Sequence, residues 1–210
     1  MKFLSKSLIL LALLGISSAF AQPALYVDGT HYETIAKPVR TADPNKVEVT
    51  EVFWYGCPHC YAFEPLINSW AEKLPSDVAF VRSPGIWSAI MEVHAQIYYV
   101  AESLGVLDKV HSVAFDNIHQ KGNYLEDGEA VKAMFVGQGV SPEDFDKTWD
   151  SFAMTSAVKK AATRMREYGV SSVPCLIVNG KYLITINDSV KTQADMLKVV
   201  DYLVGKERKS

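Results

Sequence analysis

The sequence predicts an α/β protein in which a small layer of strands and helices is interrupted by an all-helical segment. Runs typical of strands occur at residues 46–55, 78–82 and 175–186. Between the second and third of these runs lie about eighty residues in which apolar and polar positions never alternate. A sheet covered by helices, with a helical insertion ahead of its last two strands, fits this order.

The first 21 residues have the pattern of a secretory signal peptide. Lys2 and Lys6 precede the apolar run Leu8–Ile16, and Ala19-Phe20-Ala21 offers a small-x-small cleavage site. An uncleaved membrane anchor is the alternative, but the run is shorter than the roughly 20 apolar residues that span a bilayer. We therefore expect cleavage after Ala21 and export of the remainder.

The composition indicates a globular protein that uses its few thiols. Of the 210 residues, 49% are hydrophobic, which is enough to fill a core. The 24 acidic residues outnumber the 21 basic ones, and no basic stripe is present, so nucleic acid is not an expected partner. Three cysteines, Cys57, Cys60 and Cys175, are too few for a disulfide-stapled scaffold. In an exported chain they are expected to serve a reaction.

The part ahead of the helical segment is expected to contain a hairpin and two further strands. Asp28-Gly29, a favoured hairpin dipeptide, lies between two short strand-like runs within Tyr26–Ile35. Lys46–Tyr55 begins by alternating and then becomes continuously apolar, as a strand that enters a core does. Val78–Arg82 is predicted to be another short strand.

An amphipathic helix is expected to begin at Pro58, between these two strands. Its apolar positions recur at i, i+3, i+4, i+7 and i+11, which places them on one face: Phe63, Leu66, Ile67, Trp70 and Leu74. Pro65 lies inside the helix and predicts a kink, because proline has no N–H to bond back one turn.

Five helices are expected in the middle of the chain, near residues 87–104, 107–120, 127–137, 142–152 and 155–168. Breaks between them occur at Gly105, at Gly122 and at the Gly137/Gly139 pair. Ser141-Pro142-Glu143-Asp144 supplies a capping residue, a proline at the first helical position and an acid in the first turn. Gly169 is placed to end the last helix in a left-handed conformation.

The chain is expected to close with a hairpin and a helix. Asn179-Gly180, a strong hairpin signal, lies between the apolar runs Cys175–Val178 and Tyr182–Ile186. The final helix has its apolar stripe at four positions: Met196, Val199, Val200 and Leu203.

Cys57 and Cys60 lie where the buried strand gives way to a helix. Two thiols at this spacing can close a small ring, so their disulfide forms and breaks readily. At a helix N-terminus the unpaired N–H groups and the helix dipole favour a thiolate at Cys57, and His59 can add a donor or a positive charge. A thiolate is the attacking and leaving species in disulfide exchange. The pattern therefore predicts a redox couple.

Three other interpretations of the cysteine pair fit the residues less well. Zinc needs two further ligands, but Cys175 stands alone and the histidines of the helical segment follow no matching spacing. Covalent haem attachment needs a histidine directly after the second cysteine, where the chain has Tyr61. A purely structural bridge across so short a loop restricts the unfolded chain little. No metal site is expected.

Cys57-Pro58-His59-Cys60, followed by Tyr61-x-Phe63-Glu64, resembles the active site of the DsbA family of exported thiol:disulfide oxidoreductases. The similarity continues through Val173-Pro174 and Val178-Asn179-Gly180-Lys181-Tyr182. It implies a thioredoxin-like fold interrupted by an all-helical insertion domain, with the first part at 22–86, the insertion at 87–161 and the second part at 162–210. DsbA proteins are themselves a standard example of a low cysteine pKa and an oxidising couple.

The resemblance also implies roles for individual residues. Cys57 would be the nucleophile that carries the mixed disulfide with substrate, and Cys60 would be the more buried resolving partner. Pro58 and His59 would tune the redox potential of the cysteine pair. Val173 and Pro174 would lie beside the substrate. Pro174 would be a cis-proline facing the cysteines, and Val173 would offer backbone hydrogen bonds to an extended substrate segment.

Glu51 matches the buried acid of the family, and Arg82 matches a position where the family can carry a basic partner for that acid. By alternation, Glu51 shares a strand face with Val49 and Phe53. A carboxyl group there could exchange protons with Cys60. A solvent-facing glutamate at the end of a strand is the alternative.

Cys175 directly follows Pro174. If Pro174 faces the active site, alternation aims the Cys175 side chain to the opposite side, into the apolar layer. We therefore expect a buried, unreactive thiol.

The expected function is that of an oxidase. It would donate the Cys57–Cys60 disulfide to reduced or unfolded exported proteins in the periplasm, as a monomer with no bound cofactor. The resemblance implies a quinone-linked membrane thiol oxidase as the reoxidant. The alternatives are a reductase or isomerase of the same fold, or a non-catalytic thioredoxin-fold chaperone, against which the intact Cys-x-x-Cys motif speaks.

Overall fold

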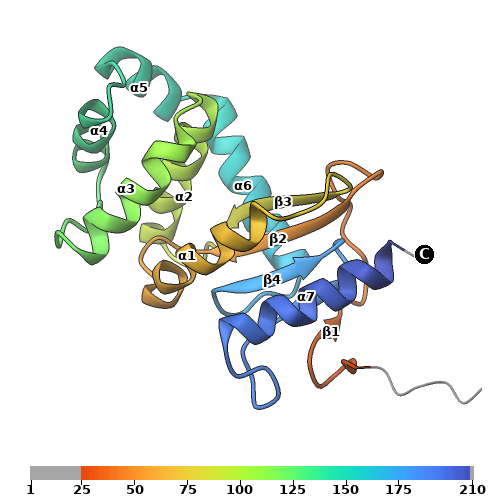
Figure 1. The fold of residues 1–210 in the computed structure, drawn as a ribbon. Helices are drawn as coiled ribbons and strands as arrows, with labels where there is room; N and C mark the ends of the chain where they lie inside the picture. Colours follow the sequence, from red (N-terminus) through yellow and green to blue (C-terminus); the bar gives the residue numbers. More distant parts are fainter. Residues whose placement is uncertain (1–24, 209–210) are drawn as a thin grey trace, which may run out of the picture.

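The computed structural model describes residues 25–208, so the expected signal peptide lies outside the described residues (Figure 1). The strands are β1 (Glu33–Thr34), β2 (Val47–Phe53), β3 (Val78–Pro84), β4 (Cys175–Val178) and β5 (Tyr182–Ile184). The helices are α1 (Pro58–Ala71), α2 (Ala89–Ser103), α3 (Leu107–His119), α4 (Gly128–Gly137), α5 (Pro142–Trp149), α6 (Phe152–Glu167) and α7 (Gln193–Glu207). The predicted fold class, an α/β layer with a helical insertion, is confirmed.

Strand β2 occupies an inner position of the five-stranded sheet, whose order is β1-β5-β4-β2-β3. It runs parallel to β3 and antiparallel to β4, and all seven of its residues are buried. The register places Glu51 opposite Arg82 of β3 and opposite Leu176 of β4. The sheet therefore brings the predicted buried acid next to its predicted basic partner.

Helices α1 and α7 cover one face of the sheet (Figure 1). Phe63 and Ile67 of α1 share a hydrophobic cluster with Val49 of β2 and with Val199 and Leu203 of α7. The apolar stripe predicted for the last helix is confirmed, since its four residues are fully buried. Because α1 is held against the sheet in this way, its N-terminus is fixed at the end of β2.

Helix α6 links the other face of the sheet to the helical insertion. It packs against both α2 and β3, and it runs unbroken through the expected domain boundary between residues 161 and 162. It begins earlier than predicted because the Ser151 hydroxyl caps it, accepting from Met154 N–H at 3.1 Å. Gly169 follows the C-cap residue Tyr168 and has φ 70°, the left-handed conformation that the sequence predicts for the end of this helix. The division into 22–86, 87–161 and 162–210 stays a prediction.

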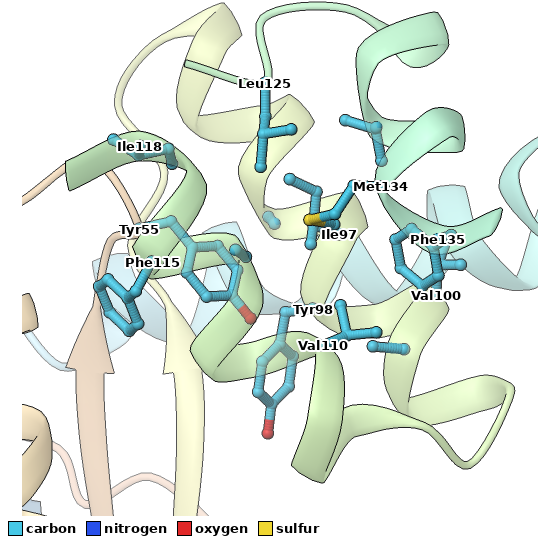
Figure 2. Packing of buried hydrophobic residues seen from close by; sticks show 14 of the residues in the cluster. Tyr55, Ile97, Tyr98, Val100, Val110, Phe115, Ile118, Leu125, Met134 and Phe135 are labelled. Carbon is cyan, nitrogen blue, oxygen red and sulfur yellow. The ribbon is translucent and has the colours of Figure 1, made fainter. Parts of the chain in front are cut away.

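The helical insertion packs around a hydrophobic cluster that continues to Phe53 of β2, and Figure 2 shows part of this cluster. Ile97 and Val100 of α2 meet Val110 of α3 and Phe135 of α4 there. Tyr55, from the segment after β2, is buried in the same core. The segment that leads to the cysteines is thus held between the sheet and the insertion. Within residues 25–208, no helix has the length and hydropathy needed to cross a lipid bilayer.

The predicted N-terminal hairpin is wrong. Asp28-Gly29 does form a turn, with Gly29 at φ 73°, but only one isolated bridge joins Asp28 to Tyr32. Strand β1 pairs instead with β5, with Thr34 opposite Tyr182. An unpaired sheet edge offers backbone partners along its whole length, and β5 presents such an edge to β1.

The predicted apolar stripe of α1 is wrong in part. Phe63 and Ile67 are fully buried, but Leu66 is 39% exposed and Leu74 lies beyond the helix end. The buried positions of the helix are Cys60, Phe63 and Ile67. Cys60, three residues before Phe63, therefore extends the buried stripe by one turn, which explains why its sulfur is shielded from water.

Candidate active site

Cys57 is the N-cap residue of α1. Its backbone is extended, with φ −88° and ψ 116°, and Pro58 follows at the first helical position. The Cys57 sulfur accepts a hydrogen bond from Cys60 N–H at 3.4 Å, as a serine or aspartate oxygen does in an ordinary helix cap. Both cysteines are free thiols, so the structure describes the reduced form.

The helix start lowers the pKa of the Cys57 thiol to about 6. The largest cause is a hydrogen bond from the Cys60 side chain. The backbone N–H groups of Cys60 and His59 and the charge of His59 lower the pKa further. Burial opposes the shift, because the sulfur has lost part of its contact with water. At neutral pH, Cys57 is therefore mainly a thiolate.

Cys60 has the opposite chemistry. Its side chain is fully buried in the stripe of α1, and burial raises its pKa far above the ordinary value for a thiol. Its hydrogen bond to Cys57 and the negative charge there raise it further. The two thiols of one couple thus differ in charge: Cys57 holds the negative charge and Cys60 holds the proton.

The loop that contains Val173 and Pro174 lies against Cys57. The Val173–Pro174 peptide bond is cis, as the resemblance implies. The carbonyl oxygen of Val173 is 3.5 Å from the Cys57 sulfur, although 116 residues separate them in sequence. The loop ahead of β4 therefore forms one wall of the site.

Glu51 is fully buried beneath the helix start, so the alternative of a solvent-facing glutamate is wrong. One carboxylate oxygen accepts from Arg82 Nε at 2.9 Å, and the other has no hydrogen-bond partner. Burial raises the pKa of Glu51 to about 7, because its effect outweighs the attraction of Arg82. Glu51 is therefore a carboxyl group that can take up or release a proton near neutral pH.

Arg82 connects Glu51 to a wider polar network that sequence reasoning missed. Its guanidinium donates to Asn68 Oδ1 at 2.6 Å and lies 3.4 Å from Glu64. His111 Nε2 lies 3.3 Å from the same Glu64 carboxylate. Burial raises the pKa of Glu64, but these donors outweigh it, so the net shift is downward. Glu64 thus carries the negative charge that balances Arg82.

His111 joins this network to the loop before Cys57. Its Nδ1 is 2.8 Å from the hydroxyl of the buried Tyr55, and burial lowers the histidine pKa. In sequence, His111 was one of several histidines in the helical segment with no metal-binding spacing, and nothing near it indicated Glu64 or Tyr55. Only the packing of α3 against α1 brings the three together.

An aromatic rim lies on the side of the helical insertion. Tyr61 stacks on His119 with ring centroids 4.8 Å apart, and His119 Nε2 donates to the Tyr55 carbonyl oxygen at 2.8 Å. A cavity of about 510 Å³ opens beside them, lined in part by Trp54 and Pro58. Cys57 therefore has an aromatic surface on one side and the Val173 loop on another.

Cys175 is kept apart from the couple. It is fully buried in β4, paired with Val52 of β2 and packed with the residues that face α6. Burial raises its pKa well above the ordinary thiol value. The prediction of a buried thiol is confirmed. Among the described residues, no three His, Cys, Asp or Glu side chains are grouped as a metal site requires.

Comparison with known proteins links this geometry to one family. The sequence model of a family described as "DSBA-like thioredoxin domain" matches residues 67–198. A protein of Pseudomonas aeruginosa named "Thiol:disulfide interchange protein DsbA" is 43% identical over 206 residues, which is 97% of each chain. A protein of the same name from Bordetella pertussis is 34% identical over 199 residues, 94% of each chain.

Solved structures agree with the sequence comparison. The crystal structure of Pseudomonas aeruginosa DsbA matches with a TM-score of 0.83 at 43% identity, covering 88% of this chain and 95% of that one. The oxidoreductase DsbA from Xylella fastidiosa matches with a TM-score of 0.82 at 29% identity, covering 89% of this chain and all of the other. The similarity therefore includes both the sheet layer and the helical insertion.

Proposed function

The chain belongs to the DsbA family and is a thiol:disulfide oxidoreductase, and from this premise we propose that it works as an oxidase that donates the Cys57–Cys60 disulfide to reduced proteins. The observation that carries the proposal is the position of Cys57 as the N-cap of α1, where its sulfur accepts from Cys60 N–H at 3.4 Å and its pKa is lowered. Stabilising the thiolate stabilises the reduced enzyme relative to the disulfide. Such a couple accepts two electrons readily, and its oxidised form passes its disulfide on.

In the first step, a substrate thiolate attacks the Cys57 sulfur of the oxidised enzyme. A substrate–Cys57 disulfide forms, the Cys57–Cys60 bond breaks, and its electron pair stays on the Cys60 sulfur. Because burial disfavours a thiolate at Cys60, that sulfur must take up a proton.

Glu51 is the proposed proton donor for Cys60. Its carboxyl group is buried, has a pKa of about 7 and exerts a charge effect on Cys60. It is therefore partly protonated at neutral pH, as a group that exchanges protons in both directions must be. Arg82 keeps the carboxyl group in place and limits the rise of its pKa.

In the second step, another substrate thiolate attacks the substrate sulfur of the mixed disulfide. The substrate disulfide forms, and Cys57 leaves as a thiolate stabilised by the protonated Cys60 thiol, by the N–H groups of α1 and by His59. The substrate has then lost two electrons and the enzyme has gained them. A low pKa makes Cys57 a good leaving group, which is what donation requires.

The neighbours of Cys57 have supporting roles in the proposal. While the cysteine of the substrate is joined to Cys57, Val173 offers backbone hydrogen bonds to an extended segment of that substrate. Pro174 shapes the loop that contains Val173. Pro58 starts the helix without an N–H of its own. His59 adds positive charge near the thiolate.

The proposed setting is the periplasm, reached through a signal peptide at residues 1–21 that is cleaved after Ala21. The proposed substrates are reduced or unfolded exported proteins. Turnover then needs a reoxidant, and a quinone-linked membrane thiol oxidase is the class proposed. The protein is proposed to act as a monomer without a bound cofactor.

Oxidative refolding of a reduced, disulfide-containing protein tests the proposal. The wild type should promote it stoichiometrically when added in the oxidised form, and Cys57→Ser should not. A Cys57→Ser variant that refolds substrate at the wild-type rate would instead support the non-catalytic chaperone. A redox potential against glutathione as reducing as that of thioredoxin-type couples would favour the reductase or isomerase.

A further inference from the structure

Gln193 is hydrogen-bonded to the backbone of the Cys57–Cys60 motif. It is the first residue of α7, and its side-chain amide nitrogen donates to the carbonyl oxygen of His59 at 2.7 Å. The two residues are 134 positions apart in sequence. A carbonyl oxygen only accepts, so the orientation of the Gln193 amide is determined by this partner.

The bonded carbonyl belongs to the same peptide group as the donor to the nucleophilic sulfur. The His59 C=O and the Cys60 N–H are the two ends of one peptide unit, and that N–H points at the Cys57 sulfur at 3.4 Å. Hydrogen bonds in a chain polarise one another, so a donor on the carbonyl side strengthens donation on the N–H side. Gln193 is therefore linked to the sulfur through one peptide group.

Apart from the Cys60 side chain, few donors other than this N–H are available to the thiolate from the helix start. The N-terminus of a helix normally presents several unpaired N–H groups, but Pro58 removes the first. The backbone groups that lower the pKa of Cys57 are those of Cys60 and His59. The strength of each remaining bond consequently matters more to the charge on Cys57.

The start of α7 is itself rigid, so Gln193 is held where it can act. Thr192 and Asp195 form a capping box: the Thr192 hydroxyl accepts from Asp195 N–H at 3.1 Å, and the Asp195 carboxylate accepts from Thr192 N–H at 3.2 Å. Two reciprocal bonds of this kind fix the first turn of a helix. Gln193 lies directly after the capping threonine.

We propose that Gln193 is a positioning residue of the redox centre, which polarises the His59–Cys60 peptide group, strengthens the N–H bond on the Cys57 sulfur and makes the disulfide easier to reduce. This inference rests on the proposed function, because it assigns the thiolate to Cys57. Gln193 does not touch the reacting sulfurs and acts through the peptide group alone.

Gln193 would shift the thiol–disulfide exchange equilibrium between the enzyme and glutathione. The enzyme disulfide and two glutathione thiols give the enzyme dithiol and glutathione disulfide; two electrons pass to the enzyme, and one of the two protons remains in solution when Cys57 is a thiolate. A weaker N–H bond disfavours the thiolate, and the equilibrium then moves back toward the enzyme disulfide.

The test compares Gln193→Met, which keeps the length of the side chain but has no donor, with the wild-type protein. We expect the acid dissociation constant of Cys57, followed by thiolate absorbance near 240 nm against pH, to fall about two- to five-fold. The equilibrium constant with glutathione should shift by a similar factor toward the enzyme disulfide. Gln193→Lys, which restores a donor of similar reach, should recover or exceed the wild-type values.

Ser189→Ala is the matched control, because it changes an exposed residue of the loop before α7 that makes no side-chain bond to the motif. It should leave both constants unchanged.

Equal constants in Gln193→Met, Ser189→Ala and wild type would overturn the inference while the wild type remained an oxidase. If Gln193→Met lowered the stability of both redox forms equally, its role would be structural only. Activity of Cys57→Ser would overturn the proposed function itself.

Discussion

The guanidinium of Arg82 donates to the buried carboxylate of Glu51 at 2.9 Å, yet the pKa of Glu51 is raised to about 7. An ion pair at this distance lowers a carboxyl pKa when both groups are solvated. Here burial has the larger effect, and the negative charges of Glu64 and Cys57 add to it. Arg82 also contacts Glu64 and Asn68, so its charge is shared. The pair therefore holds a proton near neutrality, which a simple salt bridge does not.

The stability of the protein should depend on pH through Glu51. Its pKa is about 7 in the folded state and near the ordinary 4.5 when unfolded, so the folded state binds the proton more tightly. The stabilisation is fully present below pH 4.5 and is lost as the pH rises through 7. The loss is on the order of 3 kcal/mol. Urea unfolding of the oxidised protein between pH 4.5 and 8 measures it. Cys57 carries no charge in that form, so the loss should be somewhat smaller there than in the reduced protein.

Glu51→Gln should remove most of this pH dependence, because the amide does not titrate. Glu33→Gln, which changes an exposed acid on β1, is the matched control and should keep the wild-type slope. If Glu51→Gln and the wild type lost the same free energy of unfolding over this range, the proton would reside on another group.

The reduced form should be more stable than the oxidised form, and increasingly so as the pH rises. Cys57 has a pKa of about 6 when folded and about 9 as an ordinary thiol, so the folded reduced state releases its proton first. This stabilisation is absent below pH 6 and complete above pH 9. Allowing for partial exposure of the sulfur, it is on the order of 2 kcal/mol. Melting temperatures of both redox forms at pH 5 and pH 8 measure it; the same difference at both pH values would contradict it.

Sequence reasoning succeeded where the determining residues are neighbours in the chain. Cys57 was placed at a helix start because an apolar strand ends just before it and Pro58 follows it. Gly169 was placed at a helix end because glycine tolerates the left-handed conformation found there. The ends of such helices depend on a few consecutive residues, so they can be predicted from the sequence without knowledge of the fold.

It failed where the partners are far apart and individually unremarkable. The bond between Gln193 and His59 and the approach of His111 to Glu64 join polar residues with no periodicity or spacing that relates them. Strand β1 was misplaced for the same reason, since its partner β5 lies near the other end of the chain. The resemblance and the alternation of the strand favoured burial of Glu51 over a solvent-facing position, but the size of its pKa shift depends on the packing of the layers around it.

The Cys175 thiol should be unreactive toward alkylating agents in the native protein. It is fully buried, and burial raises its pKa, so neither access nor a thiolate is available to an alkylating agent. Mass spectrometry of the oxidised native protein after treatment with iodoacetamide should find Cys175 unmodified, and denaturant should expose it. Cys175→Ala should retain the wild-type rate of substrate oxidation. Labelling of Cys175 at the rate of a surface thiol would show that β4 opens in the native state.

Gly56→Ala should damage the site through Trp54. A β-carbon at Gly56 would overlap the Trp54 ring, which must then move, and Trp54 lines the cavity beside Pro58. Overpacking of this kind costs about 1–3 kcal/mol, and the substrate oxidation rate should fall with it. Gly205→Ala in α7 is the control: a β-carbon there meets nothing within 4 Å, and alanine should stabilise the helix by about 0.5–1 kcal/mol.

The double variant separates this steric effect from a need for glycine in the backbone. In a Trp54→Leu background the ring that obstructs the β-carbon is gone, so Gly56→Ala should cost much less free energy of unfolding than it does alone. Denaturant unfolding of the four proteins of this cycle gives the coupling energy. An equal cost in both backgrounds would mean that the conformation of Gly56 itself, and not the Trp54 ring, requires glycine directly before the nucleophile.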